Sequence, residues 1–148
     1  MIQGMIEIVT GFLGSLGFAL LYNIRGKKLI TAACGGFLAW ALFLALGAFL
    51  ESEVLRYFIV SLTVSAYAEL FARLQKTPTT TFIITSLIPL IPGGSLYYTM
   101  AHAFSGHVGR FATSAIKTLT LAIALALGVV VTTAATRLLY RFGAIKHH

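Results

Sequence analysis

Charged residues are scarce in this chain, and acidic residues are the scarcest. Only 10% of the 148 residues are charged, with four acids against eleven bases, whereas an ordinary soluble domain has roughly 25%. A soluble fold covers its core with charged surface, and so few charges cannot do this. Together with 58% apolar residues and a mean hydropathy of +0.91, the shortage predicts a protein that is surrounded by a lipid bilayer.

Cysteine and catalytic motifs are nearly absent as well. Cys34 is the single cysteine, so it cannot form an internal disulfide. It lies in an apolar stretch, and we expect it to be a small buried residue. His102 and His107 are too far apart for one helical face, and no acid or cysteine accompanies them, so we predict no metal site. The chain has no nucleophile elbow, no HExxH and no phosphate loop. We therefore expect neither an enzyme nor a cofactor.

The net charge of +7 does not indicate nucleic-acid binding, because the bases do not form one run or one face. They lie between five apolar segments of about the 20 residues that a bilayer requires. We predict an all-α, polytopic membrane helix bundle that forms a single transmembrane domain over residues 1–146. The pair His147-His148 resembles a purification-tag remnant. The expected spans cover residues 2–22, 29–50, 55–74, 80–104 and 113–139.

The bases are concentrated in alternate connections between these spans. Short cytoplasmic loops are enriched in Lys and Arg, so we predict an outer N-terminus and a cytoplasmic C-terminus. The groups on the predicted cytoplasmic side are Arg25, Lys27 and Lys28, then Arg73 and Lys76, then Arg137, Arg141 and Lys146.

Small residues recur at helical spacing in three spans, and this pattern lets helices approach closely in lipid. We expect them to form tight contacts within the bundle or with another subunit, including a second copy in a homo-oligomer. They are Gly11, Gly14, Ser15 and Gly17, then Ala32, Gly36 and Ala39, then Ala122, Ala124, Ala126 and Gly128.

The fourth span contains Pro89, Pro92, Gly93 and Gly94 near its middle. Proline removes backbone donors and adjacent glycines disfavour a continuous helix, so we predict a break at Pro-x-x-Pro-Gly-Gly with a new half-helix beginning near Ser95. Broken helices at the bilayer midplane commonly line the substrate sites of transporters. A proline kink that serves packing alone is the other interpretation.

The break predicts a chemistry, because the first amides of a half-helix lack partners and attract a carboxylate. Gly93 and Gly94 would let a solute approach the backbone, and the hydroxyls of Ser95, Tyr97 or Tyr98 would orient it.

Three other polar residues are weaker candidates for gating or coupling. Glu69 is spaced i, i+4 from Arg73, which favours an interfacial ion pair over a proton relay. Glu7 is a coupling acid or an outer-interface residue, and Asn23 caps or turns the chain. Lys117 is expected at the outer rim.

Two stretches of the chain form a recognisable pattern. One is Gly17 to Asn23 followed by bases, and the other runs from Thr81-Phe82 through Pro89, Pro92 and Gly93 to Tyr97. Both resemble the threonine/serine exporter (ThrE) family. Within that family the chain is most similar to the YjjB-like small subunit of the split form.

The resemblance implies export of small amino acids such as threonine and serine, or of small carboxylates, driven by an ion gradient across the bacterial inner membrane. It also implies a larger YjjP-like membrane subunit as partner. Two other functions are a non-transporting scaffold subunit and, last, a channel made of several copies, which would require polar rings.

Overall fold

The structure is a computed structural model that describes residues 2–145, with side chains as far as residue 139. Lys146 and the predicted tag remnant His147-His148 lie outside the described residues. In the described part of the chain all regular structure is helical. The elements are α1 (Ile2–Leu21), α2 (Lys27–Gly47), α3 (Glu53–Leu74), α4 (Thr79–Leu87), a 3-10 turn η1 (Ile88–Leu90), α5 (Gly93–Phe104) and α6 (Val108–Ile145).

Four of these helices, α1, α2, α3 and α6, are each long and apolar enough to cross a membrane. The segments Thr79–Leu90 and Gly93–Phe104 form a pair bent by 58°, which makes a fifth span if the pair is one broken helix. The predicted helix bundle with a broken fourth member is therefore confirmed. The last helix extends beyond the predicted residues 113–139 at both ends.

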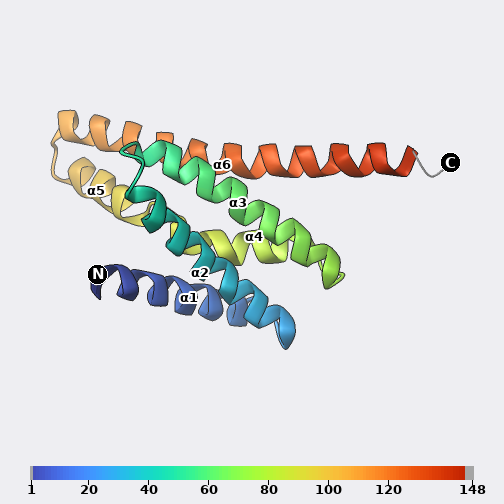
Figure 1. Ribbon diagram of the computed structural model, residues 1–148. Coiled ribbons are helices and arrows are strands. Elements are labelled where there is room, and N and C mark those ends of the chain that lie inside the picture. Colours follow the sequence, from blue (N-terminus) through green and yellow to red (C-terminus); the bar gives the residue numbers. More distant parts are fainter. Residues whose placement is uncertain (1, 146–148) are drawn as a thin grey trace.

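The helices lie side by side with their axes roughly along one direction (Figure 1). The pairs α1 with α2 and α3 with α6 share the largest interfaces, and α4 packs between α2 and α3. In contrast, α5 packs substantially against α6 alone. The half-helix after the break therefore leans away from α1, α2 and α3.

Apolar contacts hold the bundle in two clusters. One surrounds the break and parts of α2, α3 and α6, and the other joins α1, α2, α3 and α4 further along. Interhelical hydrogen bonds add to them, as expected for helices in lipid. The first cluster contains Ala39, Tyr57, Val60, Val64, Leu90, Leu121 and Ala124, and the second contains Ala19, Ile24, Ala32, Ala68, Ala72 and Phe82.

Two glycines show why small residues recur at helical spacing. A Cβ on Gly36 would lie 2.7 Å from the backbone oxygen of Gly11, and a Cβ on Gly128 would lie 2.8 Å from that of Phe58. Larger side chains would force α1 from α2 and α6 from α3. The predicted close packing is confirmed at these positions, whereas a Cβ on Gly17 would meet open space.

The expectation that Cys34 is buried is wrong, because its side chain is exposed. The buried face of α2 uses Thr31, Ala32, Gly35 and Gly36. Cys34 lies on the opposite face of α2, together with Ile30 and Phe37, which are also exposed.

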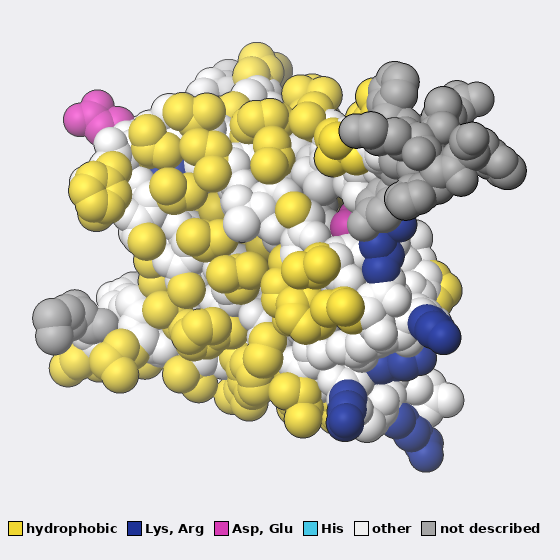
Figure 2. Space-filling view, turned by 45° about the vertical axis from the view of Figure 1, so that its right-hand side comes forward, with side chains coloured by type: hydrophobic (Ala, Val, Ile, Leu, Met, Phe, Trp, Pro, Cys, Tyr) yellow, Lys and Arg dark blue, Asp and Glu magenta, His cyan; other side chains and the backbone are white. Residues whose placement is uncertain are grey.

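Lys and Arg side chains gather at one end of the bundle, where α1 connects to α2 and α3 to α4 (Figure 2). We call this the basic end. The opposite end holds the connection from α2 to α3, with Glu51 and the start of α3. The described basic-end residues are Arg25, Lys27, Lys28, Arg73, Lys76 and Arg137.

Candidate functional site

The break separates α4 and α5 about halfway along the bundle (Figure 1). Helix α4 ends at Leu87, the 3-10 turn carries the chain to Leu90, and buried Pro92 precedes the first residue of α5. The new half-helix begins at Gly93, slightly before the predicted position at Ser95. The fixed φ of proline suits the residue that leads into a helix.

One carbonyl released by the break is satisfied by a neighbouring helix. Pro89 has no N–H, so it cannot donate to the oxygen of Thr85 as a helical residue would. The hydroxyl of Ser15 on α1 donates to that oxygen instead, at 2.8 Å. Both residues are buried, and an unpaired carbonyl in lipid would be costly. The sequence is therefore adapted to a lasting break in the fourth span.

Two amide donors at the start of α5 have no acceptor among the described residues. The N–H of Gly93 donates to the oxygen of Ile91 at 2.6 Å, and that of Leu96 donates to Pro92 at 3.0 Å. No hydrogen bond is formed by the amides of Gly94 and Ser95 within the described chain. They form the positive end of a half-helix, which favours an anion.

Gly93 and Gly94 are exposed, and a Cβ at either position would meet no atom within 4 Å. Neither residue has a positive φ. Neither backbone strain nor packing inside the described chain therefore requires glycine here. Glycine does leave the adjacent amides open to whatever approaches this face.

A polar cavity of about 210 Å³ opens beside these amides, between α5 and the first half of α6. Lys117 lines it and also forms an ion pair of 2.8 Å with Glu53 at the start of α3. The cavity thus combines one cation with hydroxyl groups close to the start of the half-helix. Its lining residues are Ser95, Tyr98, His102, Ser114 and Lys117.

A second cavity, of about 370 Å³, lies at the basic end between α3, α4 and α6. It combines an acid and a guanidinium group with an apolar wall. Its lining residues are Glu69, Pro78, Thr79, Thr80, Ile83, Ile84, Val129, Thr133 and Arg137. Packed side chains of the first apolar cluster, including Leu90 and Leu121, lie along the bundle between the two cavities.

A family model described as "Threonine/Serine exporter, ThrE" matches residues 7–135, which covers α1 to most of α6. The chain belongs to the threonine/serine exporter family. The predicted resemblance is confirmed, and the chain is a multi-pass membrane protein of a transporter family. No curated protein and no solved structure matches the chain.

The exporter match includes the broken helix, the cavity beside α5 and the lining of the basic-end cavity except Arg137. The structure brings Ser95 and Tyr98 together in the cavity beside α5. Tyr97 lies outside its lining and is 69% exposed, although its ring packs edge-to-face on that of Tyr98 with centroids 5.6 Å apart. Pro89 and Pro92 shape the backbone and do not line the cavity.

The weaker candidates of this exporter chain lie apart from the break. Glu7 is half-buried in the first part of α1. Asn23 lies in the connection from α1 to α2, with a φ of 57°, and its side chain accepts a hydrogen bond of 3.0 Å from Arg25. Glu69 lines the basic-end cavity. Among the described residues, no three His, Cys, Asp or Glu side chains form a group that could hold a metal ion.

Sequence reasoning missed Lys117, Ser114 and His102 as neighbours of the break. Ser114 and Lys117 share one face of α6, but the sequence carries no signal that this face meets Ser95 and Tyr98. Their proximity depends on how the α5–α6 hairpin packs, which hydropathy alone does not reveal.

Proposed function

We propose that this chain is one subunit of a secondary exporter that carries small amino acids, of the threonine and serine type, or small carboxylates out of the cell. The proposed membrane is the bacterial inner membrane, and the proposed partner is a larger YjjP-like membrane subunit. Membership of the exporter family supports transport, and the geometry of the break supports the position of the substrate site.

The proposal rests chiefly on the amides of Gly94 and Ser95, which have no acceptor among the described residues and lie at the bend of the candidate broken span. A substrate carboxylate would accept hydrogen bonds from both and meet the positive end of α5. Hydrogen bonds to a charged acceptor are roughly twice as strong as neutral ones. The ammonium of Lys117 adds a second attraction from α6, while Tyr98 and Ser95 supply hydroxyls for orientation.

The distribution of charge supports an orientation in the membrane, and with export it orders the two cavities along the path. Basic loops favour the cytoplasmic side, so we place the basic end in the cytoplasm and the cavity of Lys117 toward the outside. A substrate would then enter at the basic end, meet the amides at the break, and leave between α5 and α6. The apolar cluster around Leu90 and Leu121 would separate the two openings in the resting state.

Two features support a second subunit at this site. Helix α5 packs substantially only on α6, and Gly93 and Gly94 face open space. A carboxylate bound to the amides of Gly94 and Ser95 would therefore be covered on one side only. We propose that the YjjP-like subunit supplies the other wall, so that the closed site forms only in the hetero-oligomer.

The test is the substitution of Gly93 or Gly94 by leucine. A leucine at either position has space within this chain, so the bundle should keep its fold while the side chain blocks the amides. We expect threonine and serine efflux from cells producing both subunits to fall by at least tenfold. Membrane insertion and thermal stability should stay unchanged. Gly109→Leu is the matched control, because a Cβ there also meets open space but far from the break.

Normal efflux by Gly93→Leu and Gly94→Leu would contradict a substrate site at the break. Lost efflux together with lost association between the two subunits would favour the scaffold function instead. Co-purification of the subunits is therefore measured for every variant.

A further inference from the structure

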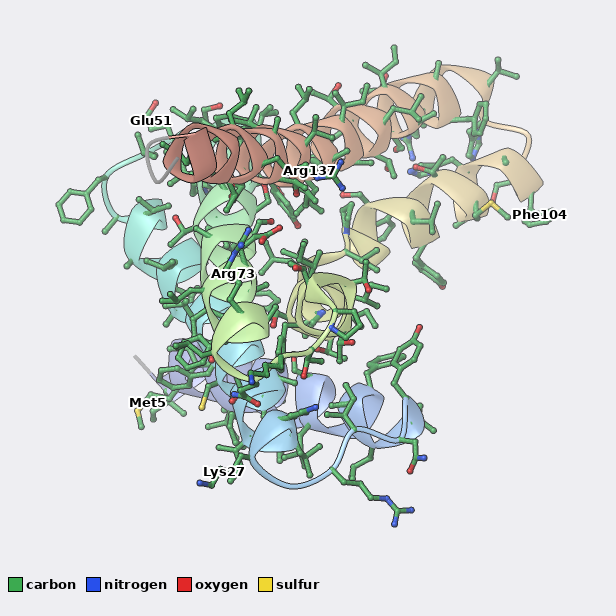
Figure 3. All side chains as sticks on the ribbon, turned by 90° about the vertical axis from the view of Figure 1, so that its right-hand side faces the viewer. Met5, Lys27, Glu51, Arg73, Phe104 and Arg137 are labelled. Atoms are coloured by element: carbon green, nitrogen blue, oxygen red, sulfur yellow. The ribbon has the colours of Figure 1, made fainter. Side chains whose placement is uncertain are left out.

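We infer that the basic-end cavity is an entry site that selects zwitterionic amino acids, with Glu69 binding the ammonium group and Arg137 binding the carboxylate. This inference rests on the proposed export function and extends it, because the cavity lies on the opposite half of the bundle from the α5–α6 cavity. Figure 3 looks onto the basic end and shows Arg73 on α3 and Arg137 on α6, with α4 below them.

Glu69 is unusual because it is an acid held almost entirely away from solvent. Its side chain is 11% exposed, and it lies within a transmembrane helix. Charged groups at such positions are costly, rare and usually functional. A carboxylate without a binding role could be replaced by a neutral residue at this position. A buried carboxylate needs cationic partners, and Arg73 supplies one of them.

The ion pair with Arg73 occupies one acceptor position of the Glu69 carboxylate and leaves others open. Arg73 Nη2 contacts Glu69 Oε2 at 3.3 Å, which is longer than the 2.7–2.9 Å or so of a strong charge-assisted hydrogen bond. A carboxylate offers about four acceptor positions. Among the described residues, no other side chain donates a hydrogen bond to Glu69. Because Glu69 lines the cavity, the remaining positions are available to a bound ammonium group, which has three donors.

Arg137 provides the complementary charge across the same cavity. Its side chain is exposed on α6, and no described residue forms an ion pair or hydrogen bond with it. A guanidinium group has donors in a planar fork that matches a carboxylate with two parallel hydrogen bonds. Acid and base on opposite helices thus match the two charges of an amino acid in its ordinary ionised form.

The size and the position of the cavity agree with this role. Its volume of about 370 Å³ falls in the range of about 300–1,000 Å³ for small-molecule sites. Ile83, Ile84 and Val129 form an apolar wall suited to a small side chain. Helix α4 lines the cavity with its first residues and ends at the break. A solute that follows α4 inward therefore reaches the amides of Gly94 and Ser95.

The test compares serine with two analogues that each lack one charge. 3-Hydroxypropionate is serine without its ammonium group, and ethanolamine is serine without its carboxylate. Each competes with radiolabelled serine for transport into everted membrane vesicles that carry both subunits, which expose the cytoplasmic face. In Glu69→Gln we expect the preference for serine over 3-hydroxypropionate to fall roughly ten- to hundredfold, the loss expected for one charged hydrogen bond. The preference over ethanolamine should remain.

Arg137→Gln should show the reverse pattern, losing the preference over ethanolamine and keeping that over 3-hydroxypropionate. A structural defect would lower transport of all solutes without this split. Lys27→Gln and Glu51→Gln are matched controls, because each removes one charge outside the cavity. Where a variant no longer transports, the same two preferences are measured as binding of the three solutes to the purified full-length complex by calorimetry.

Unchanged preferences in both variants, with normal serine transport by the unmodified protein, would overturn this inference and leave the exporter function intact. Absence of serine and threonine transport by the unmodified complex would instead contradict the proposed function itself. Loss of both preferences in each variant would also overturn the inference, since it assigns one charge to one residue.

Discussion

At the scale of single residues, Lys117 has two possible roles for its positive charge, an ion pair with Glu53 and a contact to solute in the cavity beside α5. Its ammonium lies 2.8 Å from the carboxylate of Glu53, which joins α6 to α3. It also lines the cavity beside the half-helix of the break, together with Ser95 and Tyr98. The ion pair is exposed to solvent, and exposed ion pairs contribute little to stability. The second neighbourhood is therefore the better reason for a positive charge at this position.

Exchanging the two charges separates these roles. Lys117→Glu combined with Glu53→Lys keeps the ion pair and the net charge, but places a negative charge in the cavity. We expect thermal stability to match that of the unmodified protein, while serine efflux falls about tenfold or more because one charged contact to the carboxylate is lost. Thermal unfolding in detergent and vesicle efflux provide the two measurements. Full efflux by the exchanged pair would limit Lys117 to a structural role.

At the scale of whole elements, the break was predictable because its cause is local. Pro89 and Pro92 remove donors wherever they occur, and two adjacent glycines weaken the helix further. The compensation by Ser15 was not predictable, because Ser15 and Thr85 are distant in sequence and meet only when α1 packs on α4. The same holds for Cys34, whose exposure depends on which face of α2 the neighbouring helices cover.

The ends of α6 show another limit of hydropathy. The apolar segment predicts residues 113–139, but the helix runs from Val108 to Ile145. Backbone hydrogen bonds continue a helix through polar residues outside the apolar segment, so hydropathy marks the span and leaves the helix ends undetermined. In the candidate site, Ser95 and Tyr98 follow from the break, whereas Lys117 and Ser114 required the packing of α5 on α6.

Removing both prolines tests whether the bend itself matters. Proline costs about 3 kcal/mol in a helix interior and glycine about 1 kcal/mol, so Pro89→Ala with Pro92→Ala should favour a continuous helix through the break. We expect spin labels at Ile84 and Met100, both exposed on either side of the bend, to move apart as the 58° angle opens. Efflux should fall in parallel, because the amides of Gly94 and Ser95 would enter the helical ladder.

A control for this pair is Pro78→Ala, since Pro78 precedes α4 and lies outside the bend. It should leave the distance between the labels unchanged; efflux is not compared in this control, because Pro78 lines the basic-end cavity. A straightened helix that still exports serine at the normal rate would show that the bend serves packing alone.

At the scale of the whole molecule, the two ends of the bundle differ in the character of their connections. The basic end carries positive residues in two connections and near the end of α6 (Figure 2). The opposite end carries Glu51 and Glu53 beside Arg56. Both proposed sites depend on this asymmetry, because the cavity of Glu69 must face the cytoplasm and that of Lys117 the outside. The orientation in the membrane is therefore the assumption that they share.

The single cysteine makes this orientation directly measurable. Cys34→Ser gives a chain without thiols, into which Glu51→Cys or Lys27→Cys places one exposed thiol at either end. A membrane-impermeant maleimide added to intact cells should label the thiol at position 51 and spare the one at position 27, since basic loops stay in the cytoplasm. Lysis should make both reactive. The inverted pattern would place the cavity of Glu69 outside, where it would meet the solute after transport, and equal labelling in intact cells would mean that the chain inserts in both orientations.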